Sequence, residues 1–192
     1  MNLALFDFDG TLTKKDSLNE FLKYSVDTQT YLQNMLRFGP FFILWQLKLM
    51  SNSTAKQHLL KIFFKDMDKN EFEKLAKEFS LTKIDSILRE DRFKILQEHK
   101  QNGDRVIIVS ASLQSWLQPW CDKNKIELLC TQLEFVEGKV TGKFSTPNCH
   151  GFEKVNRIKE FLDLYIYETI YAYGDSSGDV QMLDIADYGV HY

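Results

Sequence analysis

The sequence predicts an α/β fold in which a doubly wound parallel sheet carries a helical cap inserted after its first strand. Apolar stretches of strand length alternate with helical periodicity through residues 86–192, and such alternation is typical of a parallel sheet covered by helices. A similar apolar stretch opens the chain at residues 3–8, whereas residues 14–85 show helical periodicity only. We therefore expect residues 1–13 and 86–192 to form the α/β core and residues 14–85 to form the cap.

The composition is that of one globular unit without a basic surface. The chain has 192 residues, 44% of them apolar, and a formal net charge of −3, so it can bury roughly 70% of its unfolded surface. The scattered lysines and arginines argue against nucleic acid as a partner. The apolar N-terminal stretch is interrupted by Asp7 and Asp9 and does not resemble a secretory signal. Three cysteines lack the spacing of a zinc site or disulfide framework, and we expect reduced thiols in a cytoplasmic protein; they are Cys121, Cys130 and Cys149.

The cap is expected to contain helices only. Each predicted helix has apolar residues at helical spacing, and most begin at a residue that can cap an N-terminus. In chain order they are a helix opened by the capping box Ser17-x-x-Glu20, the apolar run 41–50, a helix capped by Ser53 or Thr54, and a helix opened by Asp68-x-x-Glu71.

The core is expected to alternate between strands and helices. A helix through residues 84–96 ends at Asn102-Gly103, and the β-branched run 106–109 is a strand. Residues 110–112 end that strand and begin a helix that Pro119 kinks or ends. The remaining expected elements are a strand and a hairpin within 126–145 turning at Glu137-Gly138, a helix over 152–162, a strand over 170–173, a helix over 180–186 and a strand over 189–192.

One cap segment, residues 38–50, is strongly apolar. A bilayer-spanning helix needs about 20 apolar residues, and stretches this short are usually buried helices or interfacial segments. We expect a buried or pocket-lining helix, and a surface that contacts lipid or a partner is the alternative.

Polar side chains follow the predicted strands at the points where these end. Asp7 and Asp9 follow the first strand, Ser110 follows the run 106–109, and Asp175 follows the strand that ends at residue 173. Ligands of open parallel sheets bind beyond the carboxyl ends of the strands. Carboxylate oxygens are the ligands Mg²⁺ prefers, while Lys154 and backbone N–H groups at helix starts can hold phosphate oxygens. The sequence therefore predicts a site for Mg²⁺ and a phosphate group.

Four motifs in chain order resemble those of the haloacid dehalogenase superfamily, subfamily IB, and more narrowly its phosphoserine-phosphatase-like branch. The resemblance covers essentially the whole chain and implies a Rossmann-like core with a C1-type cap. The matching stretches are Asp7-Phe-Asp9-Gly-Thr11, Val109-Ser110-Ala-Ser112, Gly151-Phe-Glu-Lys154-Val and Gly174-Asp175-Ser-Ser-Gly-Asp179.

The resemblance implies a Mg²⁺-dependent phosphomonoester hydrolase acting on a small phosphorylated metabolite. Asp7 would be the nucleophile that becomes an aspartyl phosphate, and Asp9 would be the general acid and base. Mg²⁺ would be held by Asp7, the Asp9 carbonyl and Asp175, and Asp179 would orient Lys154 or metal-bound water. The phosphate-binding residues would be Ser110, Ala111, Lys154 and Thr11.

Two departures from phosphoserine phosphatase proper argue against phosphoserine as the substrate. Asp16 stands where those enzymes carry a substrate-binding glutamate, and Ala111-Ser112 replaces a glycine pair. Asp16 and Ser112 are therefore candidate specificity residues, although Asp16 can equally be a helix cap.

Two other functions remain open. The apolar run in the cap favours a lipid phosphate, similar to a lysophospholipid or phosphatidylglycerophosphate, and related capped enzymes include lipid phosphatases. A phospho-accepting receiver-like module, which turns nothing over, also has clustered aspartates, a Ser or Thr and a Lys at the edge of such a sheet. The position of Asp7 and Asp9 after the first strand, the helical insertion and the late Gly-Asp motif argue against the receiver.

Overall fold

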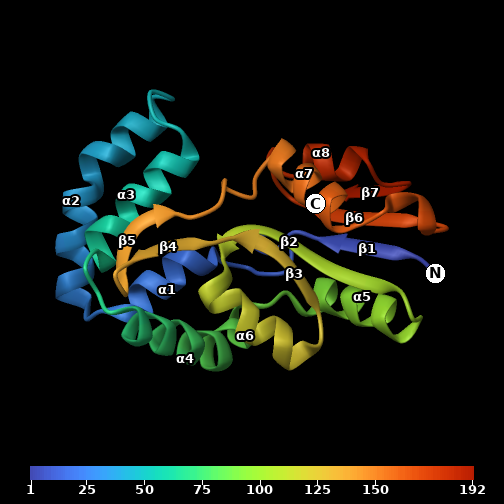
Figure 1. The fold of residues 1–192 in the computed structure, drawn as a ribbon, viewed down its shortest axis with the longest axis horizontal. Helices are drawn as coiled ribbons and strands as arrows, with labels where there is room; N and C mark the ends of the chain where they lie inside the picture. Colours follow the sequence, from blue (N-terminus) through green and yellow to red (C-terminus); the bar gives the residue numbers. More distant parts are fainter.

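The computed structural model describes residues 1–192 and contains a five-stranded, entirely parallel sheet in the order β3-β2-β1-β6-β7 (Figure 1). The first strand lies at the centre, where Leu5 is paired with Ile107 on one side and with Ala172 on the other. This arrangement confirms the predicted α/β fold. The strands are β1 Leu3–Phe6, β2 Arg105–Leu113, β3 Glu127–Thr131, β6 Ile170–Gly174 and β7 Tyr188–His191.

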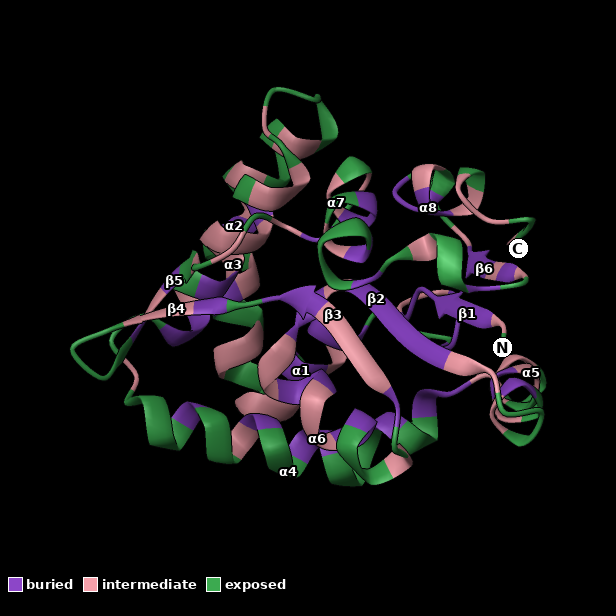
Figure 2. Cartoon of the chain, turned by 45° about the vertical axis from the view of Figure 1, so that its right-hand side comes forward, coloured by how far each residue is buried: buried purple, intermediate pink, exposed green.

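Helices cover both faces of this sheet, as doubly wound folds require. Strand β1 is buried along its whole length, and its alternate residues enter two apolar clusters: Leu3 and Leu5 in one, Ala4 and Phe6 in the other. Figure 2 shows β1 and most of β2 as buried, with one pair of helices on either side. These helices are α7 Phe152–Phe161 and α8 Val180–Asp184 on one face, and α5 Glu90–Gln101 and α6 Gln114–Asn124 on the other; a short 3-10 turn, Leu164–Ile166, precedes β6.

The predicted cap is helical, but an antiparallel hairpin from the core sequence packs against it. The chain turns at Glu137-Gly138, as predicted, with both residues at positive φ. Backbone bonds join the hairpin to the segment between α3 and α4, from the Asp66 N–H to the Val140 carbonyl (2.9 Å) and from the Lys69 N–H to the Gly138 carbonyl (2.8 Å). The elements are α1 Ser17–Ser25, α2 Thr28–Gln46, α3 Asn52–Phe64, α4 Lys69–Ile87, β4 Leu133–Val136 and β5 Lys139–Phe144.

The predicted single helix through residues 84–96 is wrong, because the chain breaks there into α4 and α5. Leu88 is extended and forms a bridge with Thr13 at the point where the chain re-enters the core. The Arg89 side chain donates to the carbonyls of Gly10 (3.2 Å) and Thr13 (3.1 Å). Helical periodicity continues across the break, so only these long-range contacts reveal it.

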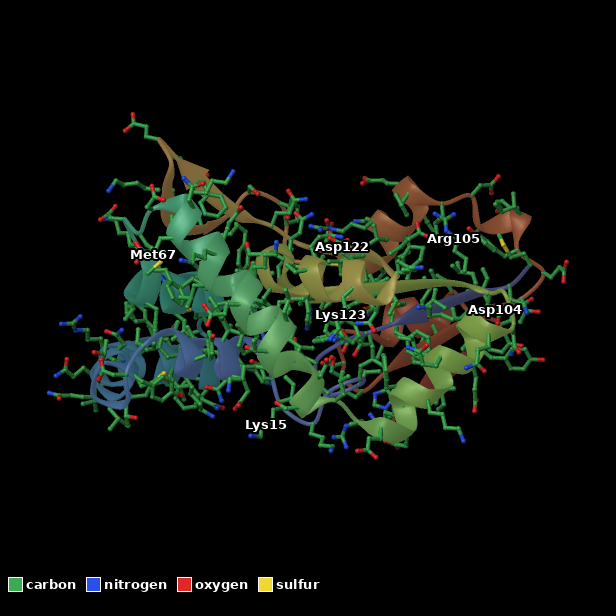
Figure 3. All side chains as sticks on the ribbon, turned by 90° about the horizontal axis from the view of Figure 1, so that it is seen from below. Lys15, Met67, Asp104, Arg105, Asp122 and Lys123 are labelled. Atoms are coloured by element: carbon green, nitrogen blue, oxygen red, sulfur yellow. The ribbon has the colours of Figure 1, made fainter.

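The second strand ends one residue beyond the predicted end at residues 110–112. Strand β2 continues to Leu113, with a shift of register against β3 after Ser110, and α6 begins at Gln114 and continues through Pro119. Helix α6 lies against α4 (Figure 3), where the Trp120 indole donates to Asp85 at 2.7 Å. A bulge that re-aims a side chain is common beside a functional site.

Two helix caps lie one to three residues from the predicted ones, whereas Asp68 caps α4 as predicted. Asp16, not Ser17, caps α1, and its carboxylate accepts the Asn19 N–H at 2.8 Å. Ser51, not Ser53 or Thr54, caps α3. Asp16 therefore acts as a helix cap, which was one of its two predicted roles, and the Ser17 side chain is free for another contact.

The prediction of a buried helix in the apolar segment 38–50 holds for one face only. Helix α2 runs through Gly39 and Pro40 to Gln46; Phe38 is buried, but Ile43, Leu47 and Leu49 are 58%, 63% and 74% exposed. Pro40 leaves one carbonyl without a helical partner, that of Leu36, and Leu36 is exposed to water. None of the helices combines the length and apolar character that crossing a bilayer would need.

Candidate active site

The carboxyl ends of β1 and β6 bring the first and fourth motifs together. Asp7 follows β1 directly, and its N–H donates to the Tyr173 carbonyl of β6 at 2.9 Å. The Asp7 side chain is buried, with 7% of the residue exposed. Burial raises the pKa of Asp7 to about 6 although Lys154 counteracts it.

Lys154 is the buried cation of the site. Its ammonium lies 2.6 Å from Asp7 Oδ1, 2.7 Å from Asp179 Oδ1 and 2.6 Å from the Val109 carbonyl, so each of its N–H groups has an acceptor. Burial disfavours the charged ammonium, but the two carboxylates outweigh this effect and raise the pKa of Lys154. Lys154 is therefore charged in the folded protein and links α7 to two strands of the core.

Asp179 holds both Lys154 and the loop that follows β6. Its Oδ2 accepts the N–H (3.0 Å) and the hydroxyl (2.7 Å) of Ser176. Burial alone would raise the pKa of Asp179, yet Lys154 and the Ser176 bonds lower it. Both carboxylate oxygens of Asp179 are thus engaged in positioning other groups.

Thr11 and Gly10 bring Asp175 against Asp7. The fully buried Thr11 hydroxyl lies 2.9 Å from Asp175 Oδ1 and 3.2 Å from Asp7 Oδ2. Gly10 has φ +84°, and a Cβ there would lie 2.1 Å from Asp175 Oδ2. The Thr11 hydroxyl therefore lies between two carboxylates. Only glycine at position 10 permits this close approach of Asp175.

Three carboxylates surround the single ammonium. Oxygens of Asp7, Asp175 and Asp179 lie within 4.8 Å of one another, so full ionisation leaves two uncompensated negative charges beside Lys154. The donor set suits Mg²⁺, which prefers hard oxygen ligands and usually takes one or two carboxylates. Asp179 is engaged by Lys154 on one oxygen and by Ser176 on the other, whereas the single Thr11 proton can serve only one of Asp7 Oδ2 and Asp175 Oδ1. Asp7 and Asp175 are therefore the side chains with oxygens left for the cation. The Asp9 carboxylate is not in this group.

Asp9 faces the cap instead. Its Oδ1 accepts the Ser17 N–H at 2.6 Å, and its Oδ2 accepts the hydroxyls of Ser17 (3.1 Å) and Ser112. Burial, with the charge of Asp16, raises the pKa of Asp9 to about 7 in spite of these bonds. Burial therefore favours the protonated form of Asp9.

The second motif places one hydroxyl at the bulge of β2 and another on Asp9. The Ser110 hydroxyl is buried at the bulge of β2 and accepts the Ser112 N–H at 3.1 Å. Ala111 is partly exposed and, with Ser112 and Lys56, lines a small hollow between core and cap. Ser112, predicted as a specificity residue, lies on Asp9.

Three residues that contact the site were not found from sequence. Ser17 donates twice to Asp9 and accepts the indole N–H of Trp116 at 3.2 Å. Arg89 and Arg92 hold the first motif from behind, and Arg92 donates to the carbonyls of Gly10 and Thr11 at 2.9 and 3.1 Å. The arginine contacts span about 80 residues, and no local pattern predicts them. The contact of Ser17 with Asp9 spans only eight residues, but the sequence indicated a helix cap at that position.

The cap contains an apolar cavity that opens beside Asp16. It measures about 410 Å³ and lies between α1, α2 and α3. Lys56 lines both this cavity and the hollow at Ser112, and it has no ion-pair partner. The apolar lining consists of Leu18, Leu22, Met35, Phe38, Phe42, Trp45, Ala55 and Leu59.

Comparison with known proteins gives the fold and family that the sequence motifs indicated. A model of the haloacid dehalogenase-like hydrolases matches residues 4–184. The chain is 33% identical to the protein CicA of Caulobacter vibrioides over 96% of its own length and 83% of that protein. It is 26% identical to a histidinol-phosphatase of Neisseria meningitidis, with 95% and 86% of the two chains covered.

Solved structures agree with this fold. A Bordetella pertussis protein of unknown function superposes with a TM-score of 0.82 at 22% identity, over 96% of this chain and 86% of that one. A phospho-aspartyl intermediate analogue of phosphoserine phosphatase superposes with a TM-score of 0.66 at 19% identity, over 96% and 82%.

Proposed function

Because this chain belongs to the haloacid dehalogenase-like hydrolases and is a phosphatase, we propose that it hydrolyses the phosphomonoester of a small metabolite through an aspartyl phosphate on Asp7. The observation that carries the proposal is the pair of carboxyl groups with different surroundings. Asp7 lies on the ammonium of Lys154, and Asp9 lies on two serine hydroxyls. These surroundings favour an ionised Asp7 and a protonated Asp9.

The chemistry divides between these two side chains. An Asp7 oxygen attacks phosphorus, the bond from phosphorus to the leaving oxygen breaks, and Asp9 gives its proton to that oxygen. A water molecule then attacks the phosphorus of the aspartyl phosphate while Asp9 takes the proton of the water. Inorganic phosphate leaves, and the Asp7 carboxylate is restored.

Other groups manage charge during these steps. Lys154 keeps Asp7 ionised. When the Asp7 oxygen bonds to phosphorus, the Lys154 N–H groups donate to phosphate oxygens. Ser110 and the backbone at Ala111 would contact the phosphate from β2, the strand next to β1. Mg²⁺, held by Asp7 and Asp175 with the Asp9 carbonyl, would neutralise negative charge on the phosphate when bound.

The leaving group would occupy the cap cavity beside Asp16. A cavity with eight apolar lining residues and the polar pair Asp16 and Lys56 at its edge suits an amphipathic leaving group. Histidinol phosphate is a candidate because of the relative named above. The apolar lining equally supports a second candidate, a lipid phosphate such as a lysophospholipid phosphate.

The nucleophile is tested by phosphate release from p-nitrophenyl phosphate with Mg²⁺. Asp7→Asn should release nothing above the blank, because an amide cannot form the acyl phosphate. The exposed Asp184→Asn, which changes the same charge away from the site, should match wild type. Equal rates for wild type and Asp7→Asn would contradict the mechanism, and absence of turnover in wild type with every substrate would favour a receiver-like module.

The substrate is tested by a screen with histidinol phosphate, phosphoserine and lysophosphatidic acid. Preference for an amphipathic phosphate should fall when Phe38→Ser or Trp45→Ser makes the cavity polar, with KM rising more than kcat falls. Unchanged KM values for every substrate would place the leaving group elsewhere.

A further inference from the structure

The outer face of α2 and the turn that follows it are an apolar surface with no partner in the fold. Leu32, Leu36, Ile43 and Leu47 recur at i, i+4, i+11 and i+15, which places them within about 60° on the helix. They are 56%, 78%, 58% and 63% exposed, and Leu49 in the turn is 74% exposed. We call these five residues the α2 stripe. Figure 1 shows the α2–α3 turn projecting away from the sheet.

The opposite face of the same helix is already occupied. Phe38 is buried, and Met35, Phe38, Phe42 and Trp45 line the cap cavity. Helix α2 is therefore apolar on two faces, although only one is covered by the protein. An exposed apolar patch of this kind marks an interaction site.

The charge of residues 28–65, the segment that carries the stripe, identifies the class of partner. No Asp or Glu lies between Asp27 and Asp66, and five of the 24 lysines and arginines do. This segment carries a charge of +5 within a chain of net charge −3, so the rest of the protein carries −8. The five cations are Arg37, Lys48, Lys56, Lys61 and Lys65.

We propose that the α2 stripe and the α2–α3 turn dock the protein on an anionic lipid surface. Exposed leucines with lysines and arginines and no carboxylates are the composition of an interfacial helix, which lies in the headgroup region. The helix does not need to cross the bilayer for this contact. Docking two copies through the stripe would bring like charges together, so a symmetric dimer is disfavoured.

Docking would bring the cap cavity to within one helix of the lipid surface, because the stripe and the cavity lie on different faces of α2. The docking itself does not depend on the proposed reaction, since none of the stripe residues touches Asp7, Asp9 or Lys154.

The test is co-sedimentation with vesicles of phosphatidylcholine, alone or mixed with phosphatidylglycerol. We expect binding to the mixed vesicles only, with weakening as salt is raised. Replacing Leu36, Ile43, Leu47 and Leu49 together by Gln should abolish it. Removing two cations in Arg37→Gln/Lys48→Gln should weaken it by roughly 25-fold, at about fivefold for each charge.

Matched controls distinguish docking from non-specific adsorption to vesicles, from loss of the fold and from loss of catalysis. Tyr165→Gln/Ile166→Gln removes two exposed apolar side chains on the core, which are 99% and 61% exposed, and should bind like wild type. Asp7→Asn should bind vesicles fully even though it is inactive, so failure of the reaction and failure of docking are distinguishable. Circular dichroism and sedimentation velocity of each variant report its fold and oligomeric state.

Three results would overturn the proposal. Equal binding to neutral and anionic vesicles would remove the role of charge, and absence of binding to both would remove the lipid surface. A wild-type dimer that the four-residue Gln variant converts to monomer would assign the stripe to a second copy of the chain.

Discussion

Replacing Asp9 with asparagine should stabilise the metal-free protein at pH 8 and have little effect at pH 4. The Asp9 carboxyl has a pKa of about 7 in the folded protein, raised from 3.8. A carboxyl whose pKa is higher in the folded state adds stability at low pH, and this stability is lost as the pH rises from 3.8 through 7. Asparagine does not titrate, so the variant lacks this pH-dependent loss of stability.

The magnitude follows from the two pKa values. A shift of about three units at about 1.4 kcal/mol per unit corresponds to about 4 kcal/mol at pH 8, and to less than about 1 kcal/mol at pH 4. Asparagine can preserve the local bonds, because its oxygen can accept the Ser17 N–H and its amide can donate to the Ser112 hydroxyl. The value is an upper limit for the gain in the free energy of unfolding.

The assay is urea unfolding followed by circular dichroism, with a chelator present, at pH 8, 6 and 4. The difference between Asp9→Asn and wild type isolates Asp9, because the other carboxyl groups are common to both proteins. Asp184→Asn serves as the control for removing an exposed charge. A variant no more stable than wild type at pH 8, or one equally more stable at every pH, would refute the reasoning.

Three further predictions concern the same site. Lys154→Met should lower the free energy of unfolding at pH 8 by about 3–5 kcal/mol, because it leaves Asp7 and Asp179 buried without their cation. Adding Asp179→Asn should recover part of this loss, as measured by urea unfolding. No recovery would contradict the ion-pair assignment. Mg²⁺ at a hundredfold excess over its Kd should stabilise wild type by about 2.7 kcal/mol and should not stabilise Asp175→Asn, as thermal shift measurements can check; equal shifts would place the metal elsewhere. Gly10→Ala should cost more than about 1 kcal/mol, because φ is +84° and the new Cβ meets Asp175, and calorimetry should show weakened Mg²⁺ binding, whereas wild-type affinity would argue against this contact.

Local patterns predicted the elements that carry the site. Strand β1 is a continuous apolar run because helices cover both faces of the sheet, and the run ends at Asp7. Parallel strands end at one edge, so Asp7 and Asp175 could be brought together from sequence alone. The structure brings Lys154 into contact with Asp7 and Asp179, and its role as a phosphate-binding residue stays a prediction.

Contacts between distant segments could not be predicted in this way. The break between α4 and α5 depends on the bridge from Leu88 to Thr13, which lie far apart in sequence. Ser17 was expected to cap a helix, and the structure uses its N–H and hydroxyl to hold Asp9 because Asp16 supplies the cap. In each instance a residue with several possible partners takes the one that the fold brings near.

The sequence by itself determined the parallel core, the inserted helical block and the carboxylates at the end of β1, because these follow from hydrophobic period and from strand ends. Only the tertiary structure decided that Asp9 faces the cap while Asp7 faces Lys154, which separates their chemical roles. It also decided which face of α2 lines a cavity and which remains exposed. Periodicity reports that a residue is apolar, but what covers it depends on how the helices pack in space.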